Sequence, residues 1–284
     1  MAIKKALLYL PTYPDAPSVQ LLESAAFLAQ HTGAALTAVI PELSDDRRTW
    51  PTVFGAWTVD VPAMVREVVR ISVENAALLE KEVRKTATAF QVAVDIRKVS
   101  SQMFPSSQAL VGLTRLHDLL ILPLPESNDF DRDFIHPAIF DTGRPTLLLP
   151  HGPGKRPLQC LDTIAVAWDF GREAARALSD AMPLLMSARK VLVFTVSGEK
   201  NLEKAGTIDD LKQLLTAHNL NYEIQDVALQ HESIGNAITR HALDGHADML
   251  VMGAYGHSRF REFVLGGATR GIINDPPLPV FLSH

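Results

Sequence analysis

The chain contains the same ordered series of short apolar runs twice, and this repetition limits the folds it can adopt. One pair of runs begins with Asp and a later pair begins with Pro. The matching segments are 6–10 with 164–168, 118–122 with 248–252, and 145–149 with 279–282. Because an internal repeat reveals how a chain is organised, we interpret the sequence as two copies of one structural unit.

Strands and helices are expected to alternate in both copies. In the first half we expect strands near 4–10, 35–40, 91–98, 118–122 and 146–149, with helices near 18–32, 61–89, 104–115 and 131–142. In the second half we expect strands near 162–168, 189–196, 221–229, 248–252 and 279–283, with helices near 172–187, 207–218, 232–244 and 264–274. The strand runs are apolar throughout, which is typical of a parallel sheet covered on both faces. The sequence therefore predicts an α/β fold with two doubly wound, Rossmann-like, five-stranded parallel sheets.

The two units are predicted to be separate domains at 1–150 and 158–284. The residues between them, 151–157, include two glycines and two prolines and are interpreted as a linker. A length of 284 residues agrees with two domains of ordinary size. Residues 42–60 are expected to form an irregular insertion that serves as a lid or as an interface loop.

Composition excludes several classes of function. The chain has 27 basic and 32 acidic residues and no basic run of the kind that contacts nucleic acid. No apolar run approaches the roughly 20 residues needed to span a bilayer, and the run at 6–10 is too short for a signal-peptide core. Cys160 is the only cysteine, so an internal disulfide is impossible, and we expect this thiol to be unreactive. We expect a soluble cytoplasmic protein that binds neither nucleic acid nor membranes.

Glycines follow the last long apolar run. The segment contains Gly253 and Gly256, then, after nine residues, Gly266 and Gly267, with Thr269 beyond them. Glycines at a strand end let a phosphate approach the backbone, and the amides of a following helix can hold an anion. Two interpretations stay open: a site for a nucleotide or another phosphate ligand, and a structural relic that only eases helix–sheet contact.

Other residues are expected to meet this segment in the fold. Ligands of open parallel sheets lie beyond the carboxyl ends of the strands, where Asp169 and Val196 accompany Gly253. Asp169 could serve such a ligand or cap the helix that begins near residue 172, and the two roles are compatible. Arg259 could contact phosphate or belong to a solvated loop. Trp168 could stack on a base or close the pocket.

Two five-stranded α/β halves with G-x2-G-x9-G after the fourth strand of the second half resemble a tandem universal stress protein over essentially the whole chain. ATP-binding members have a Ser or Thr directly after the third glycine and another hydroxyl residue two positions on. Here Gly253, Gly256 and Gly266 match the motif, and Thr269 matches the second hydroxyl position. Gly267 replaces the first hydroxyl residue, which removes one hydrogen bond to phosphate and weakens binding without abolishing it.

The resemblance also implies roles for residues outside the glycines. It places Asp169 beside the adenosine part of a nucleotide, the backbone of Val196 against adenine, and Met252 beside the sugar or base. It implies ATP or ADP as a non-covalent ligand, with or without Mg²⁺, in a regulatory stress-response protein that is read by a protein partner. It further implies an intramolecular pseudo-dimer that pairs through the last strand of each half, in a chain that is a monomer or a homodimer.

The first half departs from the pattern of an ATP site. Pro11 stands in the place of Asp169, Pro123 in the place of Gly253, and Glu126 two residues beyond Leu124 in the place of Gly256. Proline has no N–H to offer, and a glutamate would repel phosphate. We therefore expect no ATP site of this type in the first half.

Two other functions stay open. One is a ligand-free scaffold for protein interactions, and the other is an enzyme of the adenylyl-transfer type. The chain contains neither a G-x-S-x-G elbow nor a Walker A motif nor a Rossmann G-x-G-x-x-G fingerprint. We predict no catalytic residue and no metal site, and at most a slow ATPase activity.

Overall fold

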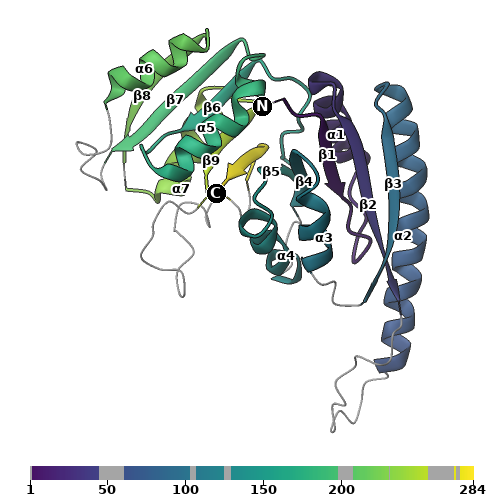
Figure 1. Cartoon of the computed structure of the whole chain (residues 1–284). Helices are drawn as coiled ribbons and strands as arrows, with labels where there is room; N and C mark the ends of the chain where they lie inside the picture. The colour runs from purple at the N-terminus through teal and green to yellow at the C-terminus, as the bar shows by residue number, and fades with distance from the viewer. Residues whose placement is uncertain are drawn as a thin grey trace.

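Strands alternate with helices through the part of the chain that the structure describes (Figure 1). The computed structural model describes residues 2–44, 61–102, 107–124, 129–197, 207–229, 231–254, 272 and 276–284. The strands are β1 (Lys5–Tyr9), β2 (Ala35–Ser44), β3 (Val94–Gln102), β4 (Leu119–Leu124), β5 (Thr146–Pro150), β6 (Thr163–Ala167), β7 (Lys190–Ser197), β8 (Tyr222–Ala228), β9 (Met249–Gly253) and β10 (Val280–Ser283). The helices are α1 (Val19–Thr32), α2 (Val61–Ala89), α3 (Ser107–Thr114), α4 (Asp129–Phe140), α5 (Arg172–Leu185), α6 (Ile208–Ala217) and α7 (Ile234–Asp244).

The strands form one sheet in the order β3-β2-β1-β4-β5-β10-β9-β6-β7-β8. Counted outward from the middle, both halves use their strands in the same order: fifth, fourth, first, second and third. Strand pairs are parallel within each half, whereas β5 and β10 pair antiparallel where the halves meet. The predicted α/β class with two doubly wound five-stranded units is therefore confirmed, and the units share one continuous sheet.

The junction of the two halves is a regular strand pair. Val280 lies opposite Leu148, and Leu282 lies opposite Thr146. This is the pairing of last strands that the resemblance implies, and it occurs within a single chain. Because the two edges pair with each other, neither is left open at the centre of the sheet.

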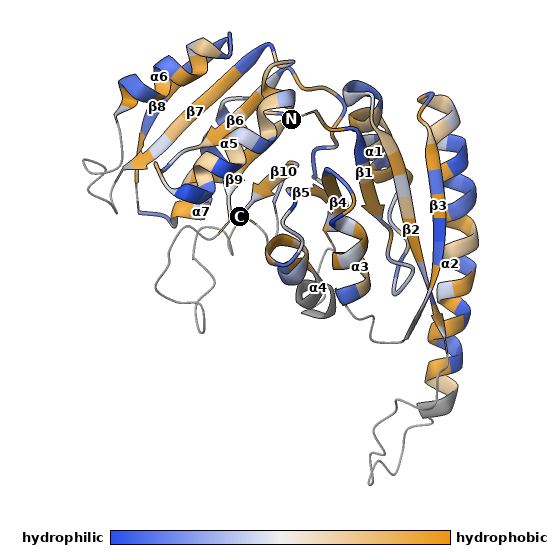
Figure 2. Cartoon of the chain, viewed as in Figure 1, coloured by the Kyte–Doolittle hydropathy of each residue, from blue (hydrophilic) through white to orange (hydrophobic). Residues whose placement is uncertain are grey.

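Helices cover both faces of the sheet. One buried cluster combines the sheet with α1, α2, α5 and α6, and a second combines it with α3, α4 and α7. Figure 2 shows mostly apolar strands and helices that are apolar on one side and polar on the other. Strands enclosed on both faces need no polar side, which explains the uninterrupted apolar runs of the sequence.

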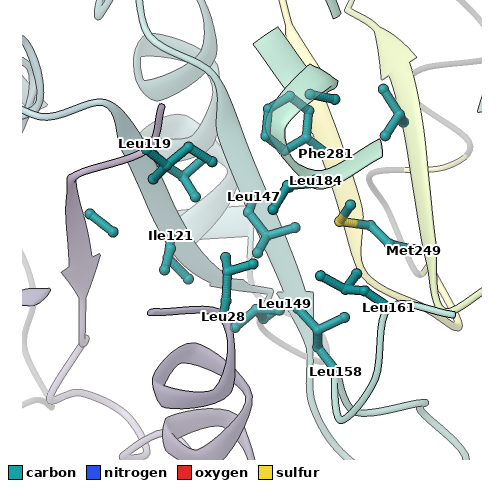
Figure 3. Packing of buried hydrophobic residues seen from close by; sticks show 14 of the residues in the cluster. Leu28, Leu119, Ile121, Leu147, Leu149, Leu158, Leu161, Leu184, Met249 and Phe281 are labelled. Carbon is teal, nitrogen blue, oxygen red and sulfur yellow. The ribbon is translucent and has the colours of Figure 1, made fainter. Parts of the chain in front are cut away.

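The first cluster continues across the junction of the halves. Leu147 of β5 and Phe281 of β10 are fully buried, and Leu28 of α1 and Leu184 of α5 belong to the same cluster (Figure 3). Complete burial of one such side chain contributes about 1.5–3 kcal/mol. The junction is therefore part of the hydrophobic core.

The repeated aspartates perform the same structural task in both halves. Asp118 Oδ2 accepts hydrogen bonds of 2.9 and 3.0 Å from the N–H groups of residues 4 and 5. Asp248 Oδ2 accepts hydrogen bonds of 2.8 and 2.9 Å from the N–H groups of residues 162 and 163. Each carboxylate thus fastens the fourth strand of its half to the start of the first strand.

The predicted boundaries are wrong at the outer edge of the first half. Strand β3 covers 94–102 instead of 91–98, and β2 continues to Ser44. The irregular insertion predicted at 42–60 is therefore a strand at 42–44, while 45–60 lie outside the described residues. These strand ends carry polar residues, and only their mutual pairing, with Ser44 opposite Gln102, makes them regular.

Two further predictions can be compared with the described helices. The helix predicted at 264–274 lies outside the described residues except at Ile272, which is helical and buried. None of the helices that the structure describes has both the length and the apolar character to cross a membrane. The longest of them, α2, carries exposed ion pairs of Arg70 with Glu67 and Glu74.

Candidate functional site

The second half reverses its strand order between β6 and β9. From β6 the sheet extends through β7 to β8 on one side, and β9 lies on the other side. The connecting helices α5 and α6 pack on one face of the sheet, and α7 packs on the opposite face. The carboxyl ends of β6 and β9 therefore flank a topological switch point, which is where open α/β sheets bind their ligands.

Asp169 lies in a tight turn directly after β6. Its Oδ1 accepts a 2.8 Å hydrogen bond from the N–H of Gly171, and the intervening Phe170 has a φ of 57°. A left-handed conformation costs a bulky residue about 1–3 kcal/mol and is enriched at ligand sites. Helix α5 begins at Arg172 with Gly171 as its N-cap and without a side-chain capping hydrogen bond. The Asp169 carboxylate thus bonds the N-cap residue directly before the first turn, and its capping role stays a prediction.

Gly253 ends β9 in direct contact with the first turn of α5. A Cβ built at this position would lie 2.5 Å from the carbonyl carbon of Glu173 and 2.6 Å from the backbone nitrogen of Ala174. A larger residue fits only if the helix moves, because both contacts are backbone atoms. The close helix–sheet contact required by the structural interpretation is thus present at Gly253.

Val196 and Met252 lie near the carboxyl ends of the two strands that pair with β6. Met252 is opposite Ala167, the last residue of β6, and Val196 is the next-to-last residue of β7. Both side chains pack in the cluster under α7, on the sheet face opposite α5. The fold therefore brings Val196 and the Met252–Gly253 pair to the same edge as Asp169, although these three segments are far apart in sequence.

The other predicted site residues lie beyond Ala254. Gly256, Arg259, Gly266, Gly267 and Thr269 are outside the described residues, and their roles stay predictions. The last described residue before them is fixed to the sheet, because the Ala254 N–H donates a 2.8 Å hydrogen bond to the carbonyl of Ser283. The His284 ring also bonds the Ala254 carbonyl, with an Nδ1–O distance of 3.0 Å.

In the first half, side-chain hydrogen bonds connect the segments at the corresponding edge of the sheet. Thr12 Oγ1 donates a 2.8 Å hydrogen bond to the carbonyl of Pro41 and lies 2.7 Å from Ser72 Oγ. Ser72 Oγ also accepts a 2.9 Å hydrogen bond from the Leu43 N–H. Asn75 Nδ2 donates to the carbonyl of Thr12 at 2.9 Å. Helix α2, which carries Ser72 and Asn75, is thus fastened to the ends of β1 and β2.

The matching registers of the two halves identify the counterparts of the site residues. The β1–β2 and β6–β7 registers place Pro41 where Val196 lies in the second half. Pro11 follows β1, and Pro123 lies buried inside β4, while Glu126 is outside the described residues. The carbonyl at the position of Val196 is therefore already bonded in the first half, a feature that sequence reasoning missed because the donor lies on another segment.

Trp168 connects β6 to the Asp169 turn and is 9% exposed. Its ring makes an edge contact with Phe170, with centroids 5.6 Å apart, and it belongs to the cluster under α5 and α6. Among the residues that the structure describes, none accepts a hydrogen bond from its indole Nε1. Trp168 is thus a core residue next to the Asp169 turn, and its indole donor has no acceptor within the described part of the chain.

Cys160 lies at the opposite, amino-terminal edge of the sheet. Its Sγ donates a 3.1 Å hydrogen bond to Asp248 Oδ1. Desolvation and then this carboxylate raise the pKa of Cys160 to about 11, so the thiol stays protonated near neutral pH and is a poor nucleophile. Within the described ranges, no group of three or more His, Cys, Asp or Glu side chains could hold a metal ion.

The strand order with its topological switch point defines a Rossmann-like α/β protein. Residues 161–284 match the Universal stress protein family. The chain therefore carries one universal stress protein domain in its second half, where the Asp169 turn and the start of the glycine motif lie.

Relatives and solved structures are similar to different extents of the chain. A universal stress protein from Synechocystis is 34% identical over 84 residues, which are 30% of this chain and 24% of the relative. The crystal structure of a universal stress protein from Archaeoglobus fulgidus has a TM-score of 0.68 at 17% identity and covers 98% of this chain and 95% of its own. The cytoplasmic domain of a prokaryotic cation chloride cotransporter has a TM-score of 0.53 at 14% identity, with coverages of 99% and 95%. At such identities the two structures establish the fold of both halves and nothing about activity.

Proposed function

We propose that the second half binds ATP or ADP at the carboxyl edge of β7, β6 and β9 and acts as a regulatory domain in a stress response. The observation that carries this proposal is the strained turn at Phe170, which holds Asp169 at the switch point beside the start of the glycine motif. The family match over 161–284 supports the same assignment.

The Asp169 turn suits the sugar of a nucleotide. A carboxylate accepts hydrogen bonds from ribose hydroxyls, and the bond from Gly171 orients this one before any ligand arrives. Orientation in advance lowers the entropy that binding would otherwise cost. In this proposal the Val196 backbone contacts adenine, Met252 borders the sugar or base, and the segment from Gly253 to Thr269 binds the phosphates.

We further propose that the first half binds no nucleotide and that one chain holds one nucleotide. The bonds of Thr12 and Ser72 to the ends of β1 and β2 occupy the backbone groups that adenine would need. Pro123 has no N–H where the glycine motif would begin. Breaking this buried hydrogen-bond network would leave unpaired polar groups. This cost would offset much of the binding free energy of a ligand that displaced the network.

The role of the nucleotide is regulatory in this proposal. A protein partner distinguishes the nucleotide-bound form from the nucleotide-free form. Turnover is at most slow, because the sequence supplies no evident general base beside the phosphates.

The test is nucleotide binding by the whole chain. Mass spectrometry of the ligands released from gently purified protein should detect ATP or ADP. Calorimetry on the nucleotide-free protein should give a stoichiometry of one nucleotide per chain.

Gly256→Glu should abolish binding, because the added carboxylate repels phosphate and its side chain occupies the space where phosphate would approach the backbone. Gly112→Glu is the matched control, since Gly112 lies on α3 with no atom near the added Cβ. Absence of nucleotide together with no thermal shift at saturating ATP would contradict the proposal.

One observation favours a second function, a ligand-free scaffold. The contact of Gly253 with α5 gives this glycine a structural role that needs no ligand. If the stripped protein shows no nucleotide affinity while Gly253→Ala still destabilises it, the scaffold becomes the better assignment.

A further inference from the structure

Residues at the end of β10 fix the backbone that follows β9. Ala254 is completely buried, and its N–H donates a 2.8 Å hydrogen bond to the carbonyl of Ser283. Its carbonyl lies 3.0 Å from Nδ1 of His284. Because a carbonyl oxygen only accepts, Nδ1 carries the proton and donates it to this bond. Both backbone polar groups of the residue after Gly253 are therefore held by two consecutive residues.

The His284 ring is in turn in contact with the first half of the chain. Phe140, the last residue of α4, meets this ring edge-on, with centroids 4.6 Å apart and an interplanar angle of 72°. Phe140 packs against the second buried cluster, and its centroid is 4.4 Å from that of His136 in the same helix. An edge-to-face contact favours one orientation of two rings, so it limits the rotation of the exposed His284 side chain. A series of contacts thus connects α4 to the Ala254 carbonyl.

The first half has a proline in the place of this histidine. The β4–β5 and β9–β10 registers match, so Leu124 and Pro150 are the counterparts of Ala254 and His284. The side chain of proline has no N–H to donate. The ring donor therefore accompanies the half for which we propose a nucleotide site.

We infer that the first half regulates the affinity of the second half for nucleotide phosphates through Phe140 and His284. This regulation rests on the proposed nucleotide site. A change in the packing of α4 moves the His284 ring and releases the Ala254 carbonyl, so the backbone at Gly253 and Ala254 shifts relative to the phosphates. Phe140 and His284 are positioning residues, because they act through Ala254.

Calorimetric titration of ATP and of adenosine into the nucleotide-free full-length chain tests the role of His284. His284→Phe keeps a ring against Phe140 and removes the donor, whereas His284→Asn supplies an amide N–H close to the position of Nδ1. The phenylalanine variant should bind ATP about two- to ten-fold more weakly, the effect of one neutral hydrogen bond. The asparagine variant should recover part of this loss. Adenosine should bind all three proteins equally, because it has no phosphate.

Phe140→Leu tests the connection to the first half. It should weaken ATP binding about two- to five-fold, the range expected for the loss of one aromatic pair. In the His284→Phe background it should have no further effect, because no donor is left to orient. Phe90→Leu is the matched control, since Phe90 is another partly buried phenylalanine of the first half and lies directly after α2. This control should leave the ATP affinity unchanged.

The outcomes separate this regulation from the proposed function. Equal ATP affinity in the parent, His284→Phe and Phe140→Leu proteins would overturn the regulation and leave the nucleotide site in place. Equal losses for ATP and adenosine would also overturn it, because they would indicate a general loosening of the fold. Additive effects of the two substitutions would show that Phe140 does not act through His284. No binding of ATP by the parent chain would overturn the proposed function and the regulation together.

Discussion

The backbone of Gly253 at the end of β9 lies against Ala174 in the first turn of α5, and a Cβ at 253 would be 2.6 Å from the Ala174 nitrogen. The first glycine of the predicted phosphate motif therefore also sets the distance between α5 and the sheet. Asp169 lies in the turn that leads into the same helix, so one contact positions both parts of the proposed site.

Gly253→Ala should lower the free energy of unfolding by about 1–3 kcal/mol, because the added methyl group overlaps backbone atoms that cannot move independently. Urea unfolding followed by circular dichroism measures this change. Gly112→Ala is the control and should be neutral or slightly stabilising, since a Cβ there meets no atom within 4 Å and alanine favours a helix. Equal effects of the two substitutions would contradict the contact at Gly253.

Asp169 should affect stability and nucleotide affinity through different atoms. Asp169→Asn keeps an oxygen that can accept the bond from Gly171, whereas Asp169→Ala removes it. The alanine variant should therefore be about 1 kcal/mol less stable than the asparagine variant. Both should bind ATP about ten-fold or more weakly in calorimetry, because a bond to a charged acceptor contributes about 1.5–3 kcal/mol. Unchanged affinity in both would remove Asp169 from the proposed site.

Gly267→Ser restores the hydroxyl that ATP-binding relatives of the resembled family have at this position. It should tighten ATP binding about two- to ten-fold, the range expected for one neutral hydrogen bond. Titration of ATP into the two proteins measures the difference. The affinity for adenosine should stay the same, and this comparison separates a phosphate contact from a general change in the crevice.

His241 should make the fold sensitive to acid. The ring packs against Phe194 with centroids 4.7 Å apart, and burial, followed by the charge of Arg240, lowers its pKa despite Asp244 and Glu223. The unfolded chain, with a pKa near 6.5, then binds more protons than the folded chain as the pH falls. The contribution of neutral His241 is thus present above the unfolded pKa and is lost as the pH falls through the folded pKa.

The comparison of His241 with His241→Phe isolates this effect. Urea unfolding at about pH 8 and about pH 5.5 should show a larger loss of stability for the parent protein than for the variant. The phenylalanine keeps a ring against Phe194 but cannot titrate. Parallel losses in the two proteins would show that other groups cause the acid sensitivity.

The order of the elements could be predicted because it depends on local patterns. Each buried strand is an unbroken apolar run, and the paired aspartates at 118 and 248 mark the start of the fourth strand in both halves. The edge strands were less predictable. Residues 98–102 of β3 are mostly polar, and their regularity comes from pairing with β2, which local sequence does not encode.

The candidate site also has features that the sequence predicts and features that it does not. The positions of Asp169, Val196 and Gly253 at strand ends follow from the predicted strands and from the rule for parallel sheets. The hydrogen bond of Asp169 to Gly171 does not follow, because Asp before a helix more often serves as its cap. The hydrogen bond between Thr12 and Ser72 in the first half could not be predicted either, since the two residues are 60 positions apart in the sequence.

The sequence by itself determined the alternation of strands and helices, the duplication and the location of the glycine motif, because these depend on hydrophobic periodicity and on residue types read along the chain. Only the tertiary structure decided that both halves share one sheet, that Gly253 lies against α5, and that Ser72 of α2 is hydrogen-bonded to Thr12 and Leu43 in the first half. These features depend on distances between residues that are remote in sequence, and such distances are fixed by packing.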